Sequence, residues 1–243
     1  MVLAAGLGTR LRPLTNDRPK ALVEINGRTL LEITIARLKT FGVAEIIVNV
    51  HHHAEMIVDY LKSKNNFDLR IEVSPEEVLL DTGGGLKKAA WFFLEDSAQL
   101  DEPFLLHNVD VISTIDLAAM LEFHKANNAL ATLAVQNRET SRYLLFDDKL
   151  QLAGRRAAND EEPEIVRPSD HLQPLAFSGI HTISPRLLPM LTEEGIFSII
   201  PAYLRLAAQN QGILAFRADQ YYWRDLGRPA DLTQAALDFP QAR

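Results

Sequence analysis

The fold is decided by the stretch Leu3-Ala4-Ala5-Gly6-Leu7-Gly8-Thr9-Arg10-Leu11-Arg12, in which an apolar strand at residues 1–5 runs into a turn with two glycines. Glycine lets the backbone turn sharply and approach a ligand closely, and the exposed N–H groups of such a turn form an anion-binding nest. Three cations follow at Arg10, Arg12 and Lys20. A planar guanidinium and a compact ammonium group both suit phosphate oxygens. The stretch therefore predicts a phosphate site directly after the first strand.

Two common phosphate motifs do not match this turn. A dinucleotide fingerprint needs a third glycine where the chain has Leu11, and a P-loop ends in a Gly-Lys-Ser/Thr triplet that the turn lacks. A plain glycine-rich turn with exposed charges remains an alternative. The added Pro13, Thr15, Pro19 and Lys20 favour a dedicated triphosphate loop over that alternative.

Strand-like and helix-like segments alternate along most of the chain, which predicts parallel βαβ units. We expect an α/β fold with a doubly wound, mostly parallel, Rossmann-like sheet, forming a single domain over residues 1–243. In such sheets ligands bind beyond the carboxyl ends of the strands. The expected strands are residues 1–5, 45–50, 69–73, 104–106 and 129–135, and the expected helices are residues 29–41, 54–62, 86–94 and 116–127.

A region at about residues 138–184 breaks the alternation and predicts a small antiparallel insertion. It contains two short strand candidates, residues 143–146 and 150–152, around the turn signal Asp147-Asp148, and then a polar stretch at residues 159–164. Regular structure resumes in the following segments: strands at 175–183, 213–217 and 221–223, and helices at 185–191, 199–209 and 229–239.

Composition narrows the function. The chain has 243 residues and a formal net charge of -7, which disfavours nucleic acid and anionic membranes as partners. It has no cysteine, which excludes disulfides, thiolate metal sites and a cysteine nucleophile. No apolar run approaches the roughly 20 residues that span a bilayer. The start lacks a secretory pattern, so we expect a cytoplasmic protein, and a few residues of the natural start are expected to be missing.

Two aspartates are candidate magnesium ligands. Asp110 follows the buried strand at residues 104–106, and Asp225 follows a short strand ending at Trp223. Magnesium prefers one or two carboxylates together with waters and substrate phosphates. Each aspartate alone is more often a turn or cap residue.

Three further elements are candidate ligand contacts. Thr82, Gly83 and Gly84 precede the expected helix 86–94, where backbone groups can bind a nucleobase or simply cap the helix. Gly179 lies in an expected strand, where it permits close approach of a sugar or forms a bulge. Asn108 suits sugar or ribose hydroxyls but equally a turn. The three histidines 51–53 are adjacent on extended chain and point to opposite sides, so we expect a solvated loop rather than a metal site.

Taken together, these motifs resemble the nucleoside-diphosphate-sugar pyrophosphorylases, the family of sugar-1-phosphate nucleotidyltransferases, over nearly the whole chain. The resemblance implies that Arg10 and Lys20 are catalytic, that Asp110 and Asp225 hold Mg²⁺, and that Asn108 and Gly179 bind the sugar. It implies nucleotide contacts from Ala4, Ala5, Gly6, Gly8, Thr9, Arg10, Thr82, Gly83, Gly84 and Asn108. The chain departs from the family at Val109, where a glycine is frequent, and this leaves the identity of the sugar open.

The resemblance also implies a reaction. A sugar 1-phosphate would attack the α-phosphorus of a nucleoside triphosphate and release pyrophosphate. The length and the triple glycine favour UTP with N-acetylmuramate 1-phosphate, in a monomer or small homo-oligomer. Guanylyl transfer to mannose or heptose 1-phosphate, and a non-catalytic sensor of sugar nucleotides, are the alternatives.

Overall fold

The computed structural model describes residues 1–95, 102–157 and 162–238, and these residues form two compact units. Unit 1 comprises residues 1–81, 107–114 and 223–243, and unit 2 comprises residues 82–106 and 115–222. The segment at residues 159–161, expected to be a polar loop, lies outside the described residues. Among those described, no helix is both long and apolar enough to span a membrane.

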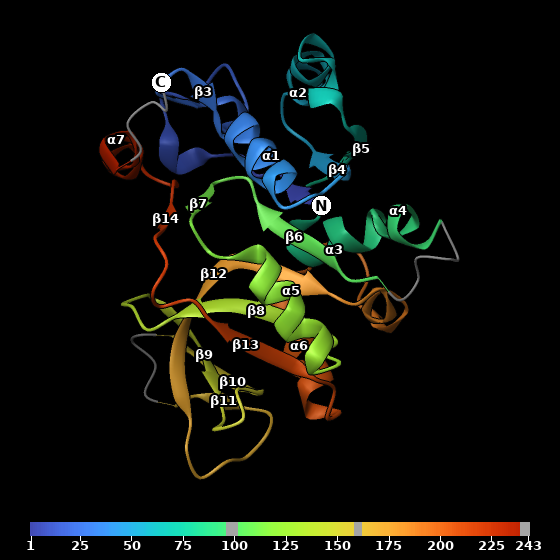
Figure 1. Ribbon diagram of the computed structural model, residues 1–243, viewed down its shortest axis with the longest axis vertical. Helices are drawn as coiled ribbons and strands as arrows, with labels where there is room; N and C mark the ends of the chain where they lie inside the picture. The colour runs from blue at the N-terminus through green and yellow to red at the C-terminus, as the bar shows by residue number, and fades with distance from the viewer. Residues whose placement is uncertain (96–101, 158–161, 239–243) are drawn as a thin grey trace. The chain divides into compact units, whose positions relative to one another are not determined.

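Unit 1 is built on parallel strands (Figure 1). The central strand β1 pairs with β4 on one side and with the end of β6 on the other, and β4 also pairs with β5. In this register Leu3 lies between Asn49 and Asn108, so two polar side chains flank the strand end that leads into the glycine turn. The strands are β1 (Val2–Leu3), β4 (Glu45–Val50), β5 (Arg70–Pro75) and the last two residues of β6 (Phe104–Asn108).

Helix α1 (Leu30–Thr40) begins at a capping residue that its sequence encodes. The side chain of Thr29 accepts a hydrogen bond from the Glu32 N–H at 3.0 Å, which satisfies one of the free donors at the helix start. The next helix, α2 (Ala54–Ser63), buries Ile57 and Leu61, four residues apart on one face. Both helices were expected within two residues of these bounds.

Smaller elements complete unit 1. A hairpin forms between β2 (Glu24–Ile25) and β3 (Arg28–Thr29), and β7 (Val111–Ser113) pairs antiparallel with β14 (Trp223–Asp225). Helix α7 (Pro229–Asp238) closes the unit, and its Ala236 carbonyl accepts a hydrogen bond from the Asn26 side chain at 2.9 Å. Short 3₁₀ turns occur at Thr9–Leu11, Lys20–Leu22 and Asn65–Asp68.

Unit 2 contains a strand that is buried along its whole length, β8 (Ala131–Gln136). It pairs antiparallel with β12 (Gln173–Ile183) and parallel with β13 (Ile213–Arg217). The helices are α3 (Asp81–Lys88), α4 (Ala90–Leu94), α5 (Leu117–Ala126) and α6 (Ile199–Ala208), with a 3₁₀ turn at Pro185–Met190. Asp116 caps α5, accepting from the N–H groups of Ala118 and Ala119 at 3.0 Å each.

The expected antiparallel region appears within unit 2. Strand β9 (Arg142–Phe146) pairs with β12 and with β10 (Leu152–Ala157), and β10 pairs with β11 (Glu164–Ile165). All these pairings are antiparallel. The second strand was expected at residues 150–152, but Leu150 and Asp147 close the turn before it, because the Leu150 N–H donates to the Asp147 carbonyl at 2.9 Å.

Two other expectations are wrong in detail. The three glycines were expected before a helix at residues 86–94, yet they lie inside α3, and a separate α4 follows. Glycine weakens a helix by about 1 kcal/mol relative to alanine, but tertiary packing overrides such preferences. The short strand expected to end at Trp223 instead begins there, because its bounds follow from pairing with β7.

Candidate functional site

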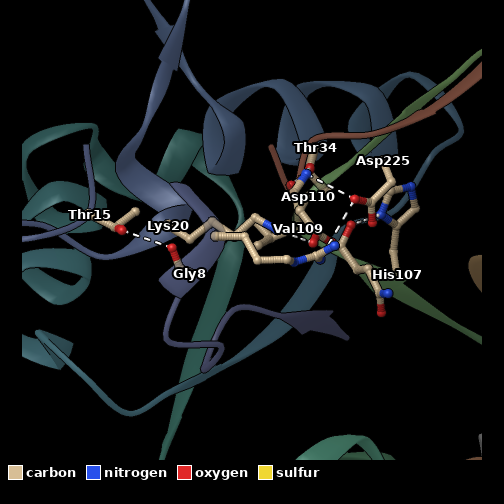
Figure 2. Close-up of polar contacts among 11 residues, drawn as sticks. Gly8, Thr15, Lys20, Thr34, His107, Val109, Asp110 and Asp225 are labelled. Atoms are coloured by element: carbon tan, nitrogen blue, oxygen red, sulfur yellow. Dashed lines mark hydrogen bonds and ion pairs between the residues drawn. The ribbon is translucent and has the colours of Figure 1, made fainter. Parts of the chain in front are cut away.

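Lys20 and Asp110 form a largely buried ion pair in unit 1 (Figure 2). The Nζ atom of Lys20 donates to Oδ2 of Asp110, and the two side chains are 9% and 19% exposed. Lys20 lies in a 3₁₀ turn, and Asp110 lies in the turn between β6 and β7, 90 residues further along the chain. The structure thus brings together a cation and a carboxylate that the sequence selected separately.

Asp225 is brought to the same place by strand pairing. In the β7–β14 ladder Asp225 lies opposite Val111, and the Leu226 N–H donates to the Asp110 carbonyl at 2.8 Å. The two aspartates therefore occupy neighbouring backbone positions, and Figure 2 shows both beside Lys20. Their proximity was expected, but the antiparallel ladder that produces it was not.

The electrostatics of this cluster leave Asp225 poorly compensated. Burial raises the pKa of the Asp225 carboxyl, and the negative charge of Asp110 raises it further. Lys20, the Gly227 N–H at 2.9 Å and Arg10 oppose the shift, with Arg10 Nη2 3.9 Å from Asp225 Oδ1. A carboxylate in this environment gains free energy when a further cation approaches.

Gly227 was not selected from the sequence, although it stands beside the candidate aspartate. A Cβ at this position would lie 2.6 Å from Asp225 Oδ1 and 2.5 Å from Arg10 Nη2. A side chain at this position would force both charged groups to move away from the backbone. The adjacent Asp225-Leu226-Gly227 string was the available signal.

The glycine turn leaves backbone donors open. Within the described residues, the N–H groups of Gly6 and Leu7 have no hydrogen-bond partner, and both residues are exposed. Gly8 has φ 63° and its carbonyl accepts from Thr15 Oγ1 at 2.8 Å and from the Leu11 N–H at 2.9 Å. Thr9 follows in the 3₁₀ turn Thr9–Leu11. Open donors beside Arg10 are what an anion-binding nest requires.

Two neighbours of the turn are already engaged. The Ala4 N–H donates to Asn49 Oδ1 at 2.7 Å, so of its backbone groups only the carbonyl remains for a ligand, and Ala5 is 5% exposed. Asn108 lies at the end of β6, and its carbonyl accepts from Nδ1 of His107 at 2.8 Å. The sequence analysis missed Asn49 and His107 as neighbours of the site, because their role depends on burial and the sequence does not show which polar residues are buried.

His107 is fully buried and precedes Asn108 in strand β6. Burial lowers the pKa of the imidazole to about 4, so the ring is neutral at neutral pH. The bond to a carbonyl requires the proton on Nδ1, which leaves Nε2 as an unprotonated acceptor. A neutral ring supports the strand end without adding a charge to the carboxylate cluster.

Val109 is part of the core of unit 1. Its side chain is 5% exposed, its N–H donates to the Leu3 carbonyl at 3.1 Å, and its carbonyl accepts from Thr34 Oγ1 at 3.4 Å. The valine that departs from the family pattern is thus buried, and both of its backbone polar groups are hydrogen-bonded.

The remaining candidate residues lie in unit 2. The N–H groups of Gly83 and Gly84 donate to the Phe197 carbonyl at 3.0 and 3.1 Å, and Thr82 Oγ1 accepts from the Ile199 N–H at 3.0 Å. Gly179 has φ 72° where the β8–β12 register shifts between Phe177 and His181, so it forms the strand bulge that was one of its two interpretations. Their ligand roles remain predictions.

The three adjacent histidines lie in three different environments. Nδ1 of His51 contacts the Glu76 carbonyl at 2.8 Å, His52 is exposed, and His53 precedes α2 with φ 55°. The described part of the chain has no group of three or more His, Asp or Glu side chains able to hold a metal ion.

Asp110 and Asp225 nevertheless fit magnesium. The ion usually takes one or two protein carboxylates and completes its shell with waters and substrate phosphates, so a site with two aspartates suffices. Burial, and after it the charge of Asp110, raises the pKa of Asp225 and so disfavours its ionised form. A divalent cation bound by the two carboxylates would favour that ionised form.

Comparison with known proteins agrees with the geometry. A family model described as nucleotidyl transferase matches residues 1–242. N-acetylmuramate alpha-1-phosphate uridylyltransferase of Caulobacter vibrioides is 33% identical over 240 residues, which cover 94% of this chain and 91% of that protein. Mannose-1-phosphate guanyltransferase of Yarrowia lipolytica is 30% identical over 233 residues, 95% of this chain but 61% of that protein.

A solved structure supports the fold. HddC from Yersinia pseudotuberculosis complexed with GMP-PN aligns with a TM-score of 0.75 over 98% of this chain and 97% of that one, at 23% identity. At this level of identity the likeness concerns the fold, and it confirms the expected Rossmann-like α/β class.

Proposed function

Because the chain belongs to the nucleotidyl transferase family and is an enzyme that acts on sugar 1-phosphates, we propose that it transfers the uridylyl group of UTP to N-acetylmuramate 1-phosphate and releases pyrophosphate. The convergence of Lys20, Asp110 and Asp225 in unit 1 supports the reaction. The choice of substrates rests on the Caulobacter relative, which this chain matches along 91% of its length.

The reaction needs little proton transfer. The second pKa of a phosphate monoester is near 6, so the attacking oxygen is already largely anionic at neutral pH. The main barrier is repulsion between two polyanions, which cations and fixed donors lower. Lys20 and Arg10 offset this charge, and the open N–H groups of Gly6 and Leu7 hold phosphate oxygens of the triphosphate. Holding both reactants in line supplies most of the remaining acceleration.

Asp110 and Asp225 would hold Mg²⁺. The ion neutralises charge on the reacting phosphates when bound. In the structure Lys20 occupies Asp110 Oδ2, so we expect Lys20 to exchange the carboxylate for a substrate phosphate when the ion is present. The lysine thereby remains paired in both states, which keeps its buried charge compensated.

The remaining assignments complete the proposal. Thr82, Gly83 and Gly84 contact the base, and Asn108 and Gly179 contact the sugar. The triphosphate contacts Gly6, Gly8, Thr9 and Arg10, and the backbone of Ala4 and Ala5. The enzyme acts in the cytoplasm as a monomer or small homo-oligomer, without nucleic acid or membrane as partners.

Guanylyl transfer to mannose 1-phosphate is the second candidate. The Yarrowia relative is 30% identical, but this chain spans 61% of its length. This difference in length is why we place the uridylyl reaction first.

Pyrophosphate release across four nucleoside triphosphates and a set of sugar 1-phosphates tests the proposal. We expect the highest kcat/KM with UTP and N-acetylmuramate 1-phosphate. Preference for GTP with mannose 1-phosphate would select the second candidate. Nucleotide binding without pyrophosphate release from any pair would indicate a non-catalytic sensor.

Two variants test the roles of the charged cluster. Lys20→Ala should reduce kcat/KM by about 10²–10³, the range for loss of one group that stabilises developing charge. Asp110→Asn should shift the magnesium titration to higher concentration. His52→Ala, an exposed site, is the control and should behave as wild type. Wild-type turnover in Lys20→Ala would remove the lysine from the reaction.

A further inference from the structure

A buried carboxylate that the proposed reaction does not use lies directly after strand β5 in unit 1. Glu76 is 5% exposed, and none of the ion pairs between described residues involves it. Burying a charge without a cation costs free energy unless hydrogen bonds compensate it. The hydrogen-bond partners of Glu76 therefore show how its burial is compensated.

Both carboxylate oxygens of Glu76 accept hydrogen bonds. Oε1 accepts from Nδ2 of Asn49 at 2.7 Å, and Oε2 accepts from the Leu80 N–H at 2.9 Å. Asn49, 3% exposed, also accepts from the Ala4 N–H at 2.7 Å through Oδ1. The contacts form one chain, from the Ala4 amide through Asn49 and Glu76 to the Leu80 amide.

In each of these hydrogen bonds, the chemistry of the groups determines which one donates and which one accepts. A backbone N–H can only donate, so the Asn49 atom facing Ala4 must be its oxygen, and its NH₂ group must face Glu76. Leu80 also donates. Glu76 therefore has to accept on both oxygens, which an ionised carboxylate does and a glutamine cannot.

The two ends of this series of hydrogen bonds, Ala4 and Leu80, lie beside segments proposed to bind the nucleotide. Ala4 precedes Gly6 and Leu7, whose open N–H groups are proposed to hold the triphosphate, and Leu80 precedes Thr82 in sequence by two residues. The Glu76 backbone is anchored as well, because its N–H donates to the Val50 carbonyl at 2.7 Å and its carbonyl contacts His51. We propose that Asn49 and Glu76 are positioning residues that hold the start of the triphosphate turn and the segment before Thr82 in place for the nucleotide.

This inference rests on the proposed function, since it concerns the same nucleotide. A shift of Ala4 would carry Gly6 and Leu7 with it. The expected defect is therefore weaker nucleotide binding, not slower chemistry once the nucleotide is bound.

A polarity swap separates positioning from stability. In Glu76→Gln one amide N–H must face another donor, and in Asn49→Asp two carboxylates face each other. The double variant Asn49→Asp/Glu76→Gln restores all three hydrogen bonds, with the bond between positions 49 and 76 reversed in direction. The new carboxylate at position 49 would accept from Ala4 and from the new amide at position 76, whose oxygen would accept from Leu80. The swap keeps the net charge and nearly the same volume.

The readouts are the Kd for UTP by calorimetry, the KM values for UTP and for the sugar 1-phosphate, kcat, and the thermal midpoint. Each single variant leaves a buried polar group without a matching partner, so it should raise the UTP Kd and KM about 10–100-fold, with kcat and the sugar KM within about threefold of wild type. The double variant should return within about threefold of wild type. Thr29→Ala, which removes the α1 cap, is the control: it should lower the thermal midpoint and leave the UTP Kd unchanged.

Folded single variants with a wild-type UTP Kd would overturn the inference. If neither single variant folds, the double variant decides: a wild-type Kd supports the inference, and a raised Kd in a folded double variant overturns it. Failure of the proposed function would appear in the wild type itself, which would bind UTP without releasing pyrophosphate or would bind another triphosphate. In the second case the same variants are measured with that triphosphate.

Discussion

The glycine turn at residues 6–8 and the triple glycine at residues 83–85 look alike in the sequence, and the structure uses them in opposite ways. In the turn, the N–H groups of Gly6 and Leu7 are open, and Gly8 has a positive φ. The triple glycine lies inside helix α3, and the N–H groups of Gly83 and Gly84 donate to the carbonyl of Phe197, which lies outside that helix.

The reasons for glycine differ accordingly. A Cβ on Gly6 would meet nothing within 4 Å, whereas a Cβ on Gly83 would lie 2.3 Å from the ring of Phe197. The first stretch keeps its backbone accessible, and the second lets helix α3 approach Phe197 closely. Glycine content alone therefore does not identify a ligand loop, because close packing selects the same residue.

The largest effect on folding is expected at Gly83. Gly83→Ala should lower the free energy of unfolding by about 1–3 kcal/mol, because the added methyl group overlaps the Phe197 ring and lies 3.0 Å from its carbonyl oxygen. Thermal unfolding measures this, with about 2–4 °C expected per kcal/mol. Phe197→Leu in the same chain should recover part of the loss. An unchanged midpoint in the single variant would mean that α3 does not pack this closely.

Gly8→Ala should have a smaller effect on folding and a clear effect on function. A left-handed φ of 63° costs a residue with a side chain about 1–2 kcal/mol, and the new Cβ would lie 3.0 Å from Lys20 Cβ. Because Lys20 pairs with Asp110, we also expect a raised KM for the triphosphate. Denaturant unfolding and initial rates measure the two effects. Wild-type values for both would show that the turn tolerates an ordinary residue.

Asp225→Asn should stabilise the metal-free protein. Burial raises the pKa of Asp225 above its usual 3.8, so the ionised form destabilises the fold at every pH above the folded pKa, and the penalty disappears below the unfolded pKa. The side chain is 39% exposed, so solvent limits the gain to below about 1 kcal/mol.

Thermal unfolding with EDTA, at pH 7 and near pH 3, measures this difference. The variant should exceed wild type at pH 7, and the gap should narrow on acidification. A lower midpoint at pH 7 would mean that Lys20 and Arg10 already compensate Asp225 fully.

Gly6→Ala should change the free energy of unfolding least, by about 0.5 kcal/mol or less, because its φ is not positive and its Cβ has free space. It is the matched control for Gly8→Ala two residues away. Thermal unfolding of both variants in one experiment makes the comparison direct. A loss as large as that of Gly8→Ala would contradict the difference drawn between these two positions.

Some expectations failed where an element depends on its neighbour. Strand β14 was placed two residues too early, because a three-residue strand takes its bounds from its partner β7. Asn49 and Glu76 were overlooked because an amide and a carboxylate 27 residues apart give no sign in the sequence that they are buried together. The sequence shows Gly227 only as a neighbour of Asp225. The space for a side chain there is limited by Arg10, which is distant in the sequence.

The sequence by itself determined the features that depend on local chemistry: the α1 and α5 caps at Thr29 and Asp116, the long strand β4, and the glycine turn with its cations. Only the tertiary structure decided which distant groups meet. The pairing of Lys20 with Asp110, the ladder that adds Asp225, and the packing of Gly83 on Phe197 arise when separate segments are buried together. Burial then sets the free-energy cost of each charge and of adding a side chain at each closely packed glycine. No local sequence pattern encodes this burial.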